Sequence, residues 1–188
     1  MLDGWYKGKP AGSGTAVWDG RVEYAAGRIN YKEFVDIVTS SAPSDGHCNV
    51  MVTASTMNSL AEALGMSLTG SANIPAPYRE RGQMAYRTGE RIVGMVEEDL
   101  TPSKIMTREA FENSIIVNSA IGGSTNAQMH ITAIARHMGL ELETEAWQNL
   151  GYDIPLLANI QPAGKYLTES YHKAGGTAAL MGELLKNK

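Results

Sequence analysis

The sequence lacks the features that would stabilise a secreted protein or insert a chain into a membrane. A single cysteine, Cys48, stands among 188 residues, so an intrachain disulfide is excluded. No apolar run reaches the length of a membrane span and no secretory signal is recognisable, so we expect a cytoplasmic protein without a membrane segment. The formal net charge is -4 and no cluster of Lys and Arg stands out, which argues against nucleic-acid binding.

Helical periodicity dominates what is present. Asn30 and Glu33 have the spacing of a capping box, which predicts a helix over 30–39. Thr107 has the residue type of a helix N-terminus, and the pair Gly122-Gly123 would end the helix that it begins. The apolar run 154–159 predicts one short buried strand. Apolar spacing predicts the other helices at 53–64, 80–96, 107–120, 127–138 and 177–185.

The fold class that follows is α/β, mainly helical with few short strands. Hydrophobic residues make up 43% of the chain and charged residues 19%, and a chain of this length can bury the core of one domain. No internal repeat or low-complexity tract divides it. We expect the helices to pack around Leu60, Ile92, Phe111, Ile116, Ile131 and Ile134.

Cys48 lies in a polar turn just ahead of the helix expected at 53–64. The run Pro43-Ser44-Asp45-Gly46 has turn chemistry, so the thiol precedes a helix N-terminus by a few residues. Partial positive charge at such an end favours a thiolate, the form that binds metal or attacks electrophiles. The residues leave a second interpretation open, because a free cysteine is usually a small buried hydrophobe. One cysteine cannot build a closed zinc or iron-sulfur site alone.

Three other groups of residues suggest binding chemistry, and each has a plainer alternative. The loop 122–126 could present N–H groups to an anion, or it could be a tight connection between two helices. His130 and His137 lie seven residues apart, which suits a metal, although a histidine before a glycine also complements a helix C-terminus. Arg79 and Arg81 could bind a carboxylate through paired hydrogen bonds, or they could belong to an exposed ion-pair network.

The segment around Cys48, GHCNVMVTASTMNSLAEALGMSL, resembles the third cluster-cysteine segment of the dihydroxy-acid and 6-phosphogluconate dehydratase family. Three later segments resemble the family in the same order, and the resemblance covers essentially the whole chain. The segment IPAPYRERGQMAY is more similar to the sequences of the branch that dehydrates sugar acids, such as arabinonate and xylonate, than to those of the branched-chain amino-acid branch. The three later segments are IPAPYRERGQMAYRTGERI (74–92), LTPSKIMTREAFENSIIVNSAIGGSTNAQMHITAIARHMG (100–139) and IPLLANIQPAG (154–164).

Members of this family are much longer than this chain. The resemblance therefore implies that 1–188 is a single partial domain, the central part of the family's N-terminal cluster-binding domain, with an upstream part and a C-terminal domain outside it. We expect the α/β fold of that domain with part of its sheet removed.

The resemblance implies an iron-sulfur-dependent hydro-lyase that removes water from a 2,3-dihydroxy acid and yields a 2-keto-3-deoxy acid. Cys48 is the one residue that can be carried over as a ligand of the cluster iron, and a [2Fe-2S] cluster is expected in preference to a [4Fe-4S] cluster. The Mg²⁺ site and the serine base of the family lie in sequence contexts, including a Cys-Asp-Lys motif, that this chain does not contain. We therefore expect a small sugar acid as substrate, a homo-oligomeric full-length form, and no activity of the chain alone.

His47, Asn49 and Thr53 are candidates for the surroundings of Cys48, because backbone N–H groups over 49–53 could tune a cluster through its sulfur atoms. The chain departs from the family's Cys-Asn-Thr-Met-Gly-Thr-Ala pattern at Val50 and Val52. A β-branched residue resists a positive φ, so Val52 either impairs the site or marks a position with an ordinary φ.

Two alternatives stand beside a segment of a sugar-acid dehydratase. One is a segment of a dihydroxy-acid dehydratase from branched-chain amino-acid synthesis. The other is a non-catalytic module that binds a partner protein or a small acid, which the missing magnesium ligands and serine base would favour.

Overall fold

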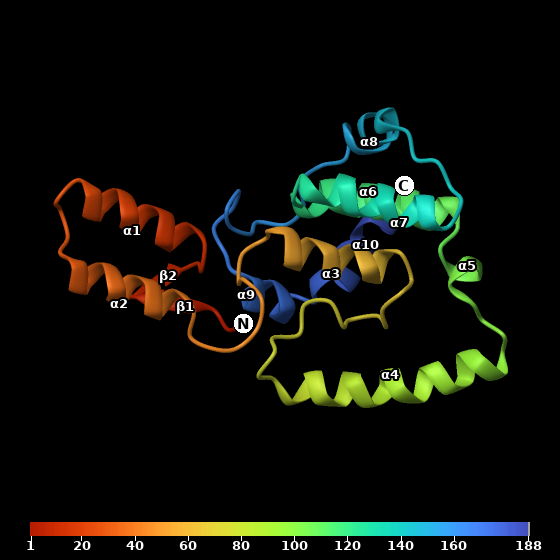
Figure 1. Ribbon diagram of the computed structural model, residues 1–188, viewed down its shortest axis with the longest axis horizontal. Helices are drawn as coiled ribbons and strands as arrows, with labels where there is room; N and C mark the ends of the chain where they lie inside the picture. Colours follow the sequence, from red (N-terminus) through yellow and green to blue (C-terminus); the bar gives the residue numbers. More distant parts are fainter. Residues whose placement is uncertain (188) are drawn as a thin grey trace.

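The structure is a computed structural model that describes residues 1–187, and helices dominate it (Figure 1). The chain begins with two short antiparallel strands, β1 (Gly4–Tyr6) and β2 (Lys9–Ala11), in a register that pairs Gly4 with Ala11. The helices follow as α1 (Thr15–Ala25), α2 (Tyr31–Ser41), α3 (Thr53–Ala63), α4 (Arg79–Glu97), α5 (Pro102–Ile105), α6 (Arg108–Ile121), α7 (Asn126–His137), α8 (Thr144–Gly151), α9 (Thr168–Lys173) and α10 (Gly176–Lys186).

The elements form an arm, a body and one separate long helix (Figure 1). The arm consists of β1, β2, α1 and α2, in which α1 packs on α2 and β1 packs on α2. The body contains α3, α6, α7, α8, α9 and α10, and its closest helix pair is α3 with α6. The long helix α4 lies along one side of the body, and α5 belongs to the connection that returns from it.

Helix ends form where the sequence predicts them. The Asn30 side chain accepts a hydrogen bond from the Glu33 N–H (2.9 Å), and the Glu33 carboxylate accepts one from the Asn30 N–H (3.2 Å). This reciprocal pair confirms the capping box that starts α2. The Thr107 hydroxyl accepts a hydrogen bond from the Ala110 N–H (3.3 Å) at the start of α6. That helix ends at Gly122, which has a φ of 62° in the left-handed region that favours glycine.

The core lies where α3, α6 and α7 meet. Leu60, Phe111 and Ile131 have no exposed surface, which confirms three of the predicted core positions. Ile134 and Ile116 are partly buried, and Ile134 packs against the edge of the core. Apolar burial of this kind contributes most of the stability of a domain, about 25 cal/mol for each Å² removed from water.

The prediction that Ile92 belongs to the core is wrong. Its side chain is 54% exposed, and α4 has no buried residue along its whole length. The apolar periodicity of α4 correctly predicted a helix, but periodicity identifies an apolar face without saying what covers it. Even so, no helix in the part of the chain that the structure describes is long and apolar enough to cross a membrane.

The strand predicted at 154–159 is also wrong. The segment forms no strand and pairs with none, and the described residues contain one isolated bridge nearby, between Ile160 and Tyr166. The N–H groups of Leu157 and Ala158 instead donate to the carbonyl oxygen of Ala120 at the end of α6 (2.8 and 3.2 Å). A short apolar run has the composition of a buried strand, but only neighbouring strands make it one.

No sequence pattern predicted β1, β2 or α1. The apolar residues of α1 are spread around the helix, and its buried residue is Gly20, against which Phe34 and Ile37 of α2 pack. Trp18 on α1 is 68% exposed. A helix without one clear apolar face has no signal at helical spacing.

Matched isoleucine substitutions test the division between core and exposed helix. Ile131→Ala should lower the free energy of unfolding by about 2 to 5 kcal/mol, because it leaves a cavity in the packed core. Ile92→Ala should change it by less than about 0.5 kcal/mol, because the Ile92 side chain is mostly in water already. Urea unfolding of the two variants and the parent chain measures both values. Equal destabilisation by the two substitutions would contradict this placement of α4.

Candidate functional site

Cys48 lies in the turn between α2 and α3, which we call the cysteine turn and define as residues 44–52. Its thiol is free and partly exposed. Gly46, two residues before it, has a φ of 121°, a conformation that residues with a Cβ rarely adopt. The backbone then runs into the N-terminus of α3 at Thr53, so the thiol precedes a helix start as predicted.

The buried side chain of Asn49 anchors the cysteine turn. Its Nδ2 group donates to the carbonyl oxygens of Leu2 (2.9 Å) and Ser41 (3.1 Å), and its Oδ1 atom accepts from the Ser13 N–H (2.7 Å). Its backbone adds two more hydrogen bonds, from its own N–H to the Ser13 hydroxyl (3.2 Å) and from the Thr168 N–H to its carbonyl (3.0 Å). Asn49, the residue that follows Cys48, is therefore hydrogen-bonded to four separate parts of the chain.

His47 and Ser55 hold the carbonyl group of Cys48. The His47 Nδ1 atom lies 2.8 Å from that oxygen, so this nitrogen carries the proton in the hydrogen bond. The Ser55 hydroxyl lies 3.2 Å from the same oxygen and 2.8 Å from the Val50 carbonyl oxygen. Burial lowers the pKa of His47 below its usual value, and the hydrogen bond to Cys48 only partly offsets this effect. The imidazole is thus a neutral donor to the backbone of the turn. Ser55 is not among the residues predicted for this site. Its position in the first turn of α3 was the one feature of the sequence that could have indicated a role there.

Thr53 lies in a different hydrogen-bonded group. Its hydroxyl accepts a hydrogen bond from the Asn126 side chain (2.8 Å) and lies 3.2 Å from the Ser124 hydroxyl. The Ser124 N–H donates to the Thr56 hydroxyl (3.0 Å). These contacts join the start of α3 to the loop 122–126, and the Asn118 side chain fills the space where a Cβ at Gly123 would lie. The structure supports the interpretation of this loop as a tight connection between helices.

Val52 has an ordinary extended conformation, with φ of -116° and ψ of -170°. This φ suits a β-branched residue, so of the two interpretations of Val52 the second is confirmed. The backbone N–H groups expected near a cluster are partly engaged elsewhere. Those of Asn49, Met51 and Val52 donate to the Ser13 hydroxyl, the Gln161 carbonyl and the Val50 carbonyl.

Among the side chains that the structure describes, Cys48 is the one that could serve as a ligand of a metal cluster. Within residues 1–187 no three side chains of His, Cys, Asp or Glu lie together in a way that could hold a metal ion. His130 and His137 are both exposed on α7, so the structure gives no support to the metal interpretation of this pair. Cys48 can supply one thiolate from a fixed backbone, and any cluster bound there needs further ligands from outside the described residues.

A network of carboxylates lies next to the cysteine turn. The Asp3 carboxylate accepts hydrogen bonds from the N–H groups of Glu169 (2.9 Å) and Ser170 (3.3 Å), and the Asp3 N–H donates to the Glu169 carboxylate (2.8 Å). Tyr78 and Lys173 also donate to the Glu169 carboxylate (2.6 and 2.7 Å). Burial alone would raise the pKa of Glu169, but these hydrogen bonds outweigh it and lower the pKa to about 2. The network ties the chain start to α9 and to the start of α4.

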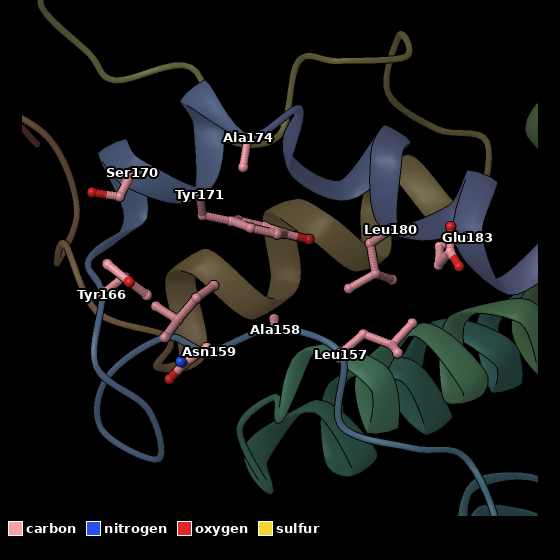
Figure 2. A pocket seen from close by; sticks show the side chains of 10 residues that line it. Leu157, Ala158, Asn159, Tyr166, Ser170, Tyr171, Ala174, Leu180 and Glu183 are labelled. Carbon is pink, nitrogen blue, oxygen red and sulfur yellow. The ribbon is translucent and has the colours of Figure 1, made fainter.

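An apolar pocket lies away from Cys48, between α9, α10 and the segment 157–160 (Figure 2). It has a volume of about 520 Å³. Figure 2 shows Tyr171 reaching from α9 across the pocket toward Leu180. Burial raises the pKa of Tyr171 to about 12, so the phenol stays protonated at neutral pH. No residue of the cysteine turn lines this pocket, and its lining offers a single carboxylate, that of Glu183.

Comparison with known proteins places these features in a family. Residues 4–188 match the family model described as dihydroxy-acid/6-phosphogluconate dehydratase, N-terminal. The chain is 59% identical over 99% of its length to the D-xylonate dehydratase of Caulobacter vibrioides, and this match covers 31% of that protein. It is 48% identical over 98% of its length to the L-arabinonate dehydratase of Rhizobium leguminosarum bv. trifolii, covering 32% of that protein.

A dihydroxy-acid dehydratase of Caldanaerobacter subterraneus subsp. tengcongensis is 44% identical over 86% of the chain, and the match covers 29% of that protein. The chain thus spans about a third of the length of these relatives. The resemblance on which the sequence analysis relied, to this family and to its sugar-acid branch, is confirmed.

Asparagine substitutions test the anchor of the cysteine turn. Asn49→Ala should lower the free energy of unfolding by about 2 to 4 kcal/mol, because it leaves the Ser13 N–H and the carbonyls of Leu2 and Ser41 without their partner. Asn58→Ala, on the exposed face of α3, should cost less than about 0.5 kcal/mol. Chemical denaturation compares the two variants. An Asn49→Ala chain as stable as the Asn58→Ala chain would show that the turn does not need this anchor.

A pH series tests the Glu169 network. The pKa of Glu169 in the folded chain, about 2, lies below the usual value of 4.5, so the stabilisation is present above about pH 4.5 and is lost as the pH falls toward 2. Glu169→Gln should therefore lower the free energy of unfolding by roughly 2 kcal/mol at pH 7 and by much less at pH 3. Glu183→Gln, at an exposed carboxylate, serves as the control and should show no such pH dependence. A Glu169→Gln deficit that stays constant from pH 7 to pH 3 would exclude the network as its cause.

Proposed function

The chain belongs to the dihydroxy-acid/6-phosphogluconate dehydratase family, and from this premise we propose that it is the part of a sugar-acid hydro-lyase that supplies one ligand to an iron-sulfur cluster. The reaction would be the dehydration of an aldonate to a 2-keto-3-deoxy acid. The observation that carries the proposal is the lone, partly exposed thiol of Cys48 on a turn that the buried Asn49 side chain fixes in place.

Dehydratases of this family use an iron-sulfur cluster and Mg²⁺. Cys48 would hold the cluster through its thiolate, and we propose a [2Fe-2S] cluster in preference to [4Fe-4S]. A bound cluster of this kind supplies a Lewis acid for the hydroxyl group that leaves as water. The remaining ligands of the cluster, the magnesium site and the base are not attributed to residues 1–187, which contain no other cysteine.

The residues near Cys48 would orient its thiol without reacting themselves. His47 and Ser55 bind the Cys48 carbonyl oxygen, and Asn49 fixes the next residue, so the Cα position of Cys48 is held from both sides. Thr53 would act one step further away, by joining the start of α3 to the loop 122–126. Such supporting contacts typically tune metal sites through the orientation of their ligands.

We also propose that the chain works as part of a longer enzyme in the cytoplasm. A single thiolate cannot complete a cluster, so the chain alone would be an inactive partial domain of a longer, homo-oligomeric enzyme. The exposed apolar residues Ile92 and Val96 of α4, at 54% and 76% exposure, support such additional contacts. A lone cysteine without an intrachain disulfide partner is consistent with a reducing cytoplasm.

The rival substrate class is that of the dihydroxy-acid dehydratases. The dihydroxy-acid dehydratase of Caldanaerobacter subterraneus subsp. tengcongensis is 44% identical to the chain, against 59% for the D-xylonate dehydratase of Caulobacter vibrioides. The sugar acid is therefore the better supported substrate, because the D-xylonate dehydratase matches more of the chain at a higher identity.

A chimeric enzyme tests the substrate class. The matching third of the Caulobacter vibrioides D-xylonate dehydratase would be replaced by this chain, at 59% identity. We expect the chimera to dehydrate D-xylonate or L-arabinonate, with a kcat/KM for the preferred aldonate at least about tenfold above that for 2,3-dihydroxyisovalerate. The unmodified D-xylonate dehydratase is the control, and formation of the keto acid is the readout. A folded, cluster-loaded chimera that prefers the branched-chain substrate would contradict the proposal.

A further inference from the structure

The long helix α4 has an apolar stripe on the face that points away from the body. Its residues recur at alternating spacings of four and three, which keeps them on one side of a helix. They are Gly82, Tyr86, Gly89, Val93 and Val96, and we call them the α4 stripe. The tyrosine and the two valines are between 59% and 76% exposed. The stripe therefore presents apolar surface to water.

Nothing within residues 1–187 covers the α4 stripe. The opposite face of α4 lines a hollow of about 490 Å³ beside the loop after α3, with Met84, Thr88 and Met95 among its lining residues. No residue of the stripe lines this hollow. The helix lies at the edge of the molecule, and none of its residues is buried (Figure 1). The stripe is thus free to contact another molecule.

The two glycines of the stripe indicate that a second helix approaches α4 closely. Glycine destabilises the interior of a helix, because it loses more conformational freedom on folding than any other residue. A Cβ at Gly82 or at Gly89 would meet no atom of the described chain within 4 Å, so packing inside the chain does not require glycine there. A backbone without a Cβ does allow another chain to come close.

The charges beside the stripe complement a second α4 that runs in the opposite direction. Arg87 precedes the middle of the stripe, and Glu90 and Glu97 follow it on the same flank. The ion pairs of α4 in the described chain involve other residues, so these three side chains are available. Two antiparallel copies centred on Gly89 would place Arg87 of each beside Glu90 of the other, whereas parallel copies would not bring these charges together.

The antiparallel arrangement also matches small residues with large ones. Gly82 of one copy would lie opposite Val96 of the other, and the two Gly89 residues would meet at the two-fold axis. A patch that complements itself in this way is what an isologous dimer requires, because the same surface of both subunits forms the contact. Charge and shape therefore both favour a second copy of this chain as the partner.

We propose that α4 is a self-association surface, on which two copies of the chain pair antiparallel through the α4 stripe. The inference rests on the proposed function in one respect, since that proposal includes a homo-oligomeric enzyme. The position of the contact rests on the residues of α4 alone.

Sedimentation of the chain over a wide range of concentrations tests this surface. The parent chain should form a dimer as the concentration rises. Arg87→Glu and Glu90→Arg should each raise the dissociation constant at least about tenfold, because each places like charges together twice in a two-fold dimer. Arg136→Glu, at an exposed arginine of α7, is the control and should leave the dissociation constant unchanged.

Mixing the two charge-reversed chains separates loss of the contact from loss of the fold. An equimolar mixture of the Arg87→Glu and Glu90→Arg chains restores opposite charges at both places, so it should form a heterodimer about as tight as the parent dimer. Gly89→Gln adds a second measurement. It should stabilise the monomer against urea, because glutamine is the better helix former, and it should weaken the dimer, because its side chain fills the space at the crossing.

A parent chain that stays monomeric, equal weakening by Arg136→Glu, or charge-reversed chains that do not pair with each other would each overturn the inference. The chimeric enzyme extends the test to full length, and its association should respond to the same two substitutions. A chimera whose association is insensitive to both would show that another part of the enzyme covers α4, which also overturns the inference. A chimera that associates through α4 but does not dehydrate aldonates would contradict the proposed reaction alone.

Discussion

The arrangement of this chain around Cys48 depends on one buried amide. The Asn49 side chain satisfies the Ser13 N–H and the carbonyls of Leu2 and Ser41, and its backbone adds the Thr168 N–H. These groups come from the chain start, the β2–α1 connection, the end of α2 and the start of α9. A buried polar group is costly unless all its partners are in place, so this set of bonds admits one conformation of the turn. Cys48 is held next to it as a consequence.

The sequence predicted helix ends correctly where a few adjacent residues determine the backbone conformation. The capping box at Asn30, the cap at Thr107 and the left-handed Gly122 each depend on a few neighbouring residues, and all three formed as expected. Burial and strand pairing, which depend on residues far away in the sequence, could not be predicted in the same way. Ile92 has the spacing of a core residue, but nothing covers it, and the segment 154–159 has the composition of a strand, but no neighbouring strand pairs with it. The partners of the Asn49 side chain lie 8 to 47 residues away in sequence, from Ser41 to Leu2, so no local pattern could identify its role as an anchor.

The residues of the candidate site could be predicted from the sequence, but their contacts could not. The resemblance to the family pointed to Cys48, and adjacency suggested His47, but hydrogen bonds across the fold define what each neighbour does. Thr53 bonds to Asn126 in the segment after α6, and this contact does not follow from spacing. A thiol on a fixed backbone, in a chain with no other cysteine, is suited to presenting one ligand to a shared cluster. On the proposed function, a chain that spans about a third of its relatives would supply a well-anchored turn and one of several cluster ligands.

The most direct test of this account is the iron and acid-labile sulfide content of the chimeric enzyme after anaerobic purification, measured together with its visible spectrum. The comparison is between Cys48 and Cys48→Ser, with Ser103→Ala, at an exposed position of α5, as the control. The account predicts a stoichiometric cluster with Cys48, a cluster retained in the control, and loss of iron and sulfide with Cys48→Ser. The same cluster content and spectrum with Cys48→Ser would show that Cys48 is not a ligand and would contradict the central claim.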